Sequence, residues 1–140
     1  ANYAYTDTEV LEVPNDLTLL KGKPLPGVPQ HAASIWLTYA FDESSALSGL
    51  GLGGGVRYVG ERFVGPNSAQ RLRPLLTEYV TLDQSYVVVD AAAWYDWENL
   101  RFGLNVTNLF DEEYIARASS DAIAHPGEPL TVIGSIRSRF

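Results

Sequence analysis

The sequence has no cysteine, no methionine, only two histidines and few basic residues. The absence of cysteine excludes a disulfide framework, a thiolate metal site and a cysteine nucleophile. Its 10 Lys and Arg against 17 Asp and Glu give a net charge of -7. This balance argues against a nucleic-acid partner, because phosphate binding needs clustered basic side chains. Since methionine is missing even at position 1, we expect the sequence to begin after a cleavage or inside a longer chain.

Long hydrophobic runs are also missing. No stretch approaches the roughly 18 apolar residues of a membrane helix, whereas a membrane strand needs only about 9 to 11 residues, half of them polar. The composition, 46% hydrophobic and 19% charged, is that of a folded chain. A mean hydropathy of -0.06 suits a membrane barrel and a soluble domain equally.

What the sequence does contain is alternation of apolar and polar residues with a period of two. Within 30–41, for example, Ile35 and Leu37 alternate with Ser34 and Trp36, which predicts a strand. No stretch shows a 3.6-residue apolar stripe, so we predict an all-β protein. Six strands are expected, at about 1–10, 30–41, 50–63, 85–97, 100–114 and 130–140.

The connections between these strands alternate in length. Two are turn-like, at 42–49 and 98–99, whereas 11–29, 64–84 and 115–129 are long polar links. Short turns at one end and long loops at the other are typical of an up-and-down membrane barrel. Aromatic residues near the strand ends fit the aromatic belts of such a barrel, although any β core is rich in aromatics. These residues are Tyr39, Phe41, Tyr58, Tyr95, Trp97, Phe102 and Phe140.

Motifs for chemistry are weak. Gly49, Gly51 and Gly54 fit G-x-G-x-x-G, the motif of dinucleotide-binding sites. Such a site needs a helix after the glycines, but the residues that follow them have the periodicity of a strand. These glycines more plausibly allow a bend or close packing. The acidic run 111–113 reads as a solvated strand end. No metal or cofactor site and no enzyme are predicted.

Four stretches together resemble the C-terminal end of a TonB-dependent outer-membrane receptor of the ferric-siderophore group. They are LPGVPQHAASIWLTYAF at 25–41, GLGLGGGVRYVGERF at 49–63, VVDAAAWYDWENLRFGLNVTNLFDEEYIA at 88–116 and GEPLTVIGSIRSRF at 127–140. Asn108-Leu109-Phe110-Asp111 followed by Tyr114 is especially characteristic, as is a terminal aromatic such as Phe140. Ser138 departs from the pattern where an aromatic is common, and His125-Pro126 departs where an aromatic often precedes Gly127.

The resemblance implies an antiparallel up-and-down transmembrane β-barrel of about 22 strands, plugged in its lumen, in the outer membrane of a Gram-negative bacterium. Residues 1–140 would be its last six strands, with the plug domain, the TonB box and the earlier strands outside them. The implied function is TonB-coupled uptake of a ferric siderophore, with iron carried only as the siderophore complex and no resident cofactor. The implied partners are the siderophore, TonB–ExbB–ExbD acting through the plug, outer-membrane lipid, and the barrel assembly machinery, which would read Phe140.

Site residues follow from this placement. For ligand contacts in the extracellular loops we name Arg71, Arg73, Tyr79 and His125, although each also reads as an ordinary exposed loop residue. For the lumen wall facing the plug we name Arg57, Glu61, Asp90, Arg101, Asn105, Arg137 and Arg139.

Two other functions remain open. A passive porin would share the strand pattern but lack a plug and a TonB box. A soluble β-sandwich binding module would bury its apolar alternation between two sheets.

Overall fold

The strands are given by a computed structural model, which describes residues 1–12, 21–63, 81–82, 85–120 and 123–138. They are β1 (Asn2–Tyr5), β2 (His31–Ala40), β3 (Leu50–Val59), β4 (Arg62–Phe63), β5 (Thr81–Leu82), β6 (Tyr86–Trp97), β7 (Leu100–Thr107), β8 (Ile115–Ser120), β9 (Ile123–Pro126) and β10 (Thr131–Ser138). Within these ranges no helix is long and apolar enough to cross a membrane.

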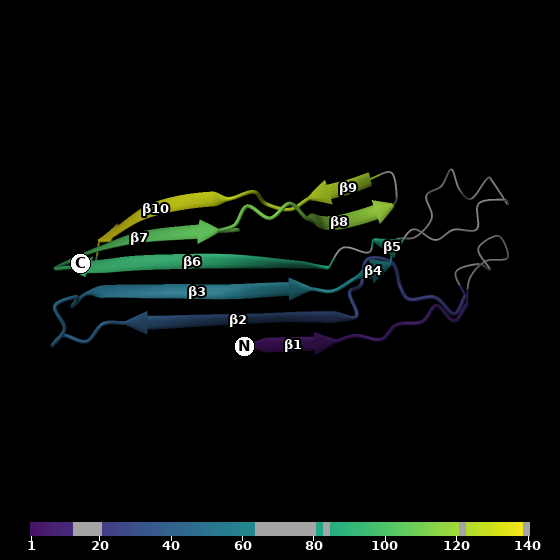
Figure 1. Ribbon diagram of the computed structural model, residues 1–140, viewed down its shortest axis with the longest axis horizontal. Coiled ribbons are helices and arrows are strands. Elements are labelled where there is room, and N and C mark those ends of the chain that lie inside the picture. The colour runs from purple at the N-terminus through teal and green to yellow at the C-terminus, as the bar shows by residue number, and fades with distance from the viewer. Residues whose placement is uncertain (13–20, 64–80, 83–84, 121–122, 139–140) are drawn as a thin grey trace.

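One antiparallel sheet dominates the molecule, with its strands in the order β1-β2-β3-β6-β7-β10 (Figure 1). Each strand therefore pairs with the next strand of the sheet along the chain, which is up-and-down topology. Two small two-stranded sheets, β4-β5 and β8-β9, lie at the end of the sheet opposite the short turns (Figure 1). All six predicted strands are confirmed as members of the large sheet.

The register gives the sheet two chemically different faces. Directly opposed residues share a face, and Ser34, Arg57 and Val88 are opposed in turn across β2, β3 and β6. We call this the polar face; on it lie Ser34, Arg57, Asp90, Asp96, Arg101, Asn105 and Arg137. We call the other the apolar face; it carries Ile35, Leu37, Leu52, Val56, Leu104, Val132 and Ile136.

The apolar face has no second layer packed against it in the described part of the chain. On this face Leu37 is 68% exposed and Ile136 is 71% exposed, and the one buried hydrophobic residue among the described residues, Val88, lies on the polar face instead. A β-sandwich would cover such a face with another sheet, so the soluble β-sandwich interpretation is wrong. A face of this kind suits contact with lipid.

Aromatic residues bound the apolar face at both ends. Tyr39, Tyr95 and Trp97 lie near the short turns and are 46–60% exposed. Tyr58 and Tyr5 lie at the end with the long links, where Tyr5 is directly opposite His31. This distribution is that of two aromatic belts flanking an apolar band.

Glycines on the polar face of β3 accommodate two tryptophans. Gly55 is directly opposite Trp36, and Gly51 is directly opposite Trp94. A Cβ atom on Gly55 would approach the Trp36 ring to 2.3 Å, and one on Gly51 would approach the Trp94 ring to 2.1 Å. The interpretation is therefore confirmed for Gly51, which packs closely, and for Gly49, whose φ of 86° bends the chain, whereas Gly54 has no atom nearer than 3.8 Å to its Cβ position.

Three expected boundaries are wrong. The first strand ends at Tyr5 rather than at 10, because Val10 bonds back to Lys23 and Gly22 instead of continuing along β2. The third breaks after Val59, where the Gly60 N–H donates to the His31 carbonyl at 2.8 Å. The fifth ends at Thr107 rather than at 114.

The fifth strand ends early because the backbone reverses direction after Thr107. Asn108 and Asp111 have φ angles of 54° and 51°, which lie outside the strand region. The link expected at 115–129 also proves to hold a β-hairpin, β8-β9, with Arg117 directly opposite His125.

Candidate functional site

The polar face carries two ion pairs. Arg57 Nε lies 2.9 Å from Asp90 Oδ2, and Arg101 Nη2 lies 2.6 Å from Asp96 Oδ2. Arg101 is also directly opposite Arg137 across β7 and β10, so Asp96 offsets one of two facing positive charges.

The remaining predicted plug-facing residues are placed less uniformly. Asn105 and Arg137 lie exposed on the polar face, whereas Glu61 lies beyond β3 and outside the sheet. Arg139 lies outside the described residues, as does the predicted assembly signal Phe140.

Among the predicted ligand contacts, His125 alone lies within the described residues. It is exposed on β9 in the β8-β9 hairpin, beside Arg117. Arg71, Arg73 and Tyr79 lie outside the described residues.

Asn108 fastens the base of this hairpin to the sheet. The side chain is 1% exposed. Its Nδ2 donates to the carbonyls of Glu112 and Glu128, each at 2.9 Å, and its Oδ1 accepts from the Glu112 N–H at 2.9 Å. The Asn108 backbone N–H also donates to Asp90 Oδ1 at 3.0 Å, which links this turn to the ion pair with Arg57. Asn108 therefore joins the segments before β8 and before β10.

Arg62 of β4 makes a second attachment, which joins the hairpin to the small β4-β5 sheet. It is 8% exposed, and its Nη1 and Nη2 donate to the carbonyls of Ala116 and Ile115, each at 2.6 Å. The guanidinium lies 5.4 Å from the centre of the Tyr86 ring, which is a cation–π arrangement.

Tyr86 in turn stacks on Tyr114, with 4.2 Å between ring centres. Tyr114 covers Gly127, where a Cβ atom would approach its ring to 2.2 Å. The sequence marked Asn108 and Tyr114 as characteristic but indicated nothing of Arg62. A buried arginine at a strand end is recognisable only once the carbonyls that it binds are placed beside it.

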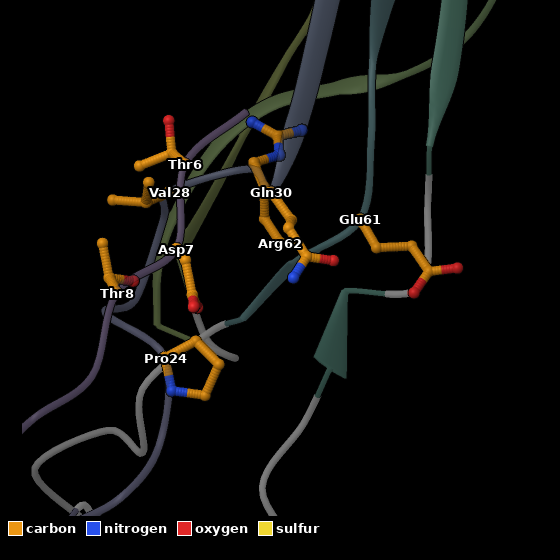
Figure 2. A pocket seen from close by; sticks show the side chains of 8 residues that line it. All are labelled: Thr6, Asp7, Thr8, Pro24, Val28, Gln30, Glu61 and Arg62. Carbon is orange, nitrogen blue, oxygen red and sulfur yellow. The ribbon is translucent and has the colours of Figure 1, made fainter. Parts of the chain in front are cut away.

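A cavity of 270 Å³ opens beside Arg62 at the loop end of β1, β2 and β3. In Figure 2, Thr6, Thr8 and Val28 lie to one side and Gln30 and Arg62 to the other, while Pro24 lies below and Glu61 projects away from the others. The described residues contain no cluster of His, Cys, Asp or Glu suited to a metal ion. The lining combines the hydroxyl, amide, carboxylate and guanidinium groups of its polar residues with the apolar side chains of Pro24 and Val28.

Comparison with known proteins gives consistent matches. Residues 1–109 match the family model described as "TonB dependent receptor-like, beta-barrel". The chain is 33% identical to the ferrichrome outer membrane transporter/phage receptor of Escherichia coli K12, over 99% of this chain and 17% of that protein. It is 34% identical to the metal-pseudopaline receptor CntO of Pseudomonas aeruginosa, over 99% of this chain and 18% of that protein.

Solved structures agree. The siderophore receptor PiuA of Acinetobacter baumannii superposes with a TM-score of 0.71 at 25% identity, over 96% of this chain and 18% of that one. The closed form of the ferric-catecholate import receptor Fiu of E. coli K12 superposes with a TM-score of 0.69 at 33% identity, over 85% of this chain and 16% of that one. The chain therefore spans less than a fifth of the length of these relatives.

Proposed function

Because the chain belongs to the TonB-dependent receptor β-barrel family, we propose that it forms part of the wall of an outer-membrane receptor for TonB-coupled uptake of a ferric siderophore. The observation that carries the proposal is the sheet with two unlike faces, an apolar band between aromatic belts on one and ion pairs on the other. In this orientation the apolar face meets outer-membrane lipid and the polar face meets the lumen.

The short turns at 42–49 and 98–99 then lie in the periplasm, and the β8-β9 hairpin lies outside the cell. On the polar face, Arg57, Asp90, Arg101, Asn105 and Arg137 contact a plug domain, and we assign the same role to Arg139. Glu61 contributes at the extracellular mouth. TonB–ExbB–ExbD acts through the plug, and the assembly machinery reads Phe140.

Ligand contacts are assigned to the loop end of the sheet. His125 and Arg117 lie together on the hairpin, and Arg71, Arg73 and Tyr79 belong to the link 64–84. Several relatives are named as receptors for siderophores or metal chelates, which supports a chelate as the cargo. The protein is a transporter rather than an enzyme, and iron enters it only as cargo.

The experiment is growth of the source bacterium on a ferric siderophore as its only iron source, with the full-length gene deleted and then restored. We expect uptake of radioactive iron to require both this gene and TonB. A passive porin, the second candidate, would give uptake that is independent of TonB and proportional to the external concentration. Loss of TonB without loss of uptake would therefore refute the receptor and favour the porin.

A further inference from the structure

Arginines on the polar face are matched by acids on the neighbouring strands. Arg57 of β3 pairs with Asp90 of β6 at 2.9 Å, and Arg101 of β7 pairs with Asp96 of β6 at 2.6 Å. Asp96 and Arg101 are also directly opposite each other in the register of the two strands. On this face, a guanidinium is therefore offset by a carboxylate that projects from the next strand of the sheet.

Arg137 of β10 is the exception in the part of the chain that the structure describes. It is exposed, and it forms no hydrogen bond or ion pair within the described ranges. The strand beside it, β7, places Arg101 directly opposite, which adds a like charge. Like charges directly opposite each other destabilise a sheet, so Arg137 needs an acid that β7 does not supply.

The other flank of β10 has room for that acid. Among the described strands β10 is the last of the large sheet and pairs with β7 alone. Ile133, on the same face of β10 as Arg137, is 55% exposed. An unpaired strand edge is not tolerated in lipid, so another strand must lie against this one. Since the chain spans less than a fifth of its relatives, an earlier part of the protein can supply it.

We propose that the strand closing the barrel against β10 carries an aspartate or glutamate directly opposite Arg137, on the lumen side. Directly opposed residues of antiparallel strands have Cβ atoms about 4.5–5.5 Å apart, which lets a carboxylate accept hydrogen bonds from a guanidinium. The same acid would offset the repulsion between Arg137 and Arg101.

This ion pair would also fix the register in which the barrel closes. A slip of one residue would turn the acid toward the apolar face, where lipid makes a charge costly. The inference rests on the proposed function only in treating the sheet as part of a barrel wall. It adds a chemical identity to one position of a strand that lies outside this chain.

The first experiment locates the facing residue in the full-length receptor. Arg137→Cys is combined with single cysteines placed in turn along the first barrel strand, and the pair that cross-links on oxidation identifies the residue opposite Arg137. We expect the wild-type residue at that position to be Asp or Glu.

The second experiment uses the sign of a stability change, measured by chemical unfolding in detergent. If no acid faces Arg137, Arg137→Gln relieves the repulsion from Arg101 and leaves stability unchanged or raised. If the acid is present, we expect Arg137→Gln to lower the folding equilibrium constant by about 2- to 5-fold, the upper part of the range for a solvent-accessible ion pair. Arg57→Gln is the matched reference, because it removes an arginine whose acid partner is known.

The acid itself is tested in the same assay. Its replacement by the corresponding amide should lower the folding equilibrium constant at least as much as Arg137→Gln does. The receptor that carries both changes should lose no more than the acid variant alone, since the two changes remove one interaction.

Three results would overturn the inference: a neutral or basic residue opposite Arg137, an Arg137→Gln receptor as stable as wild type or more so, and no cross-link from the first barrel strand. TonB-dependent uptake of radioactive iron from a ferric siderophore, measured on the same wild-type receptor, would leave the proposed function standing in each case. A wild-type receptor without such uptake would instead refute the proposed function, whereas the ion pair is judged by cross-linking and unfolding.

Discussion

Replacing Asn108 with alanine is expected to destabilise the receptor more than any other single change on the polar side of the sheet. The side chain is 1% exposed and makes three hydrogen bonds, two through Nδ2 and one through Oδ1. Its φ of 54° adds a second cost, because asparagine tolerates this left-handed conformation better than alanine does.

The two costs can be estimated separately. Three hydrogen bonds at about 0.5–1.5 kcal/mol each give roughly 2–4 kcal/mol. The left-handed conformation costs alanine a further ~1–2 kcal/mol, whereas glycine avoids this cost. We therefore expect Asn108→Ala to lower the free energy of unfolding by about 3–6 kcal/mol, and Asn108→Gly by about 2–4 kcal/mol.

Chemical unfolding of the full-length receptor in detergent measures these differences. Glu113→Ala is the control, because Glu113 lies exposed in the same turn and should change stability by less than about 0.5 kcal/mol. A difference between the alanine and glycine variants isolates the backbone cost. If both Asn108 variants unfold at the same denaturant concentration as Glu113→Ala, the attachment made by Asn108 does not hold the native barrel together.

Three further changes have expected outcomes. Gly55→Ala should displace the Trp36 ring, which would otherwise lie 2.3 Å from the new Cβ atom. We expect it to lower the free energy of unfolding by about 1–3 kcal/mol in the same assay, and a change below about 0.5 kcal/mol would show that the ring moves freely. A double-mutant cycle on Arg57 and Asp90 should give a coupling free energy of about 0.5–1.5 kcal/mol. The coupling should fall in high salt because the Arg57 side chain is 45% exposed. A coupling that is insensitive to salt would contradict a solvent-accessible pair. Glu98→Gly should raise the free energy of unfolding by roughly 0.5–1 kcal/mol, because Glu98 has a φ of 51° in the turn between β6 and β7, and unchanged stability would mean that the turn carries no strain.

The alternation of residues predicted the sheet because period-two patterns record which side of a strand is apolar. Ile35, Leu37 and Val56 lie on the apolar face as expected, and Arg57 and Asp90 lie on the polar face. The expectation was correct here because lipid on one side and a polar lumen on the other impose a sharp contrast along each strand.

The ends of the strands were harder to predict, since they are set by contacts distant in sequence. The strand expected to run to 114 ends at Thr107, because Asn108 is bonded to Glu112 and Glu128 and the chain turns there. The role of Arg62 depends on carbonyls more than fifty residues further along the chain. A local pattern carries no information about such partners.

The tryptophan–glycine pairs have a consequence for how this sequence can change over time. Trp36 opposes Gly55 and Trp94 opposes Gly51, so each ring occupies the space that a side chain on its partner would need. Neither position of a pair can gain bulk unless the other loses it. Among related sequences we therefore expect the two positions of each pair to change together, so that a smaller residue in place of the tryptophan accompanies a larger one in place of the glycine. The summed side-chain volume of each pair should then be kept better than the identity of either residue.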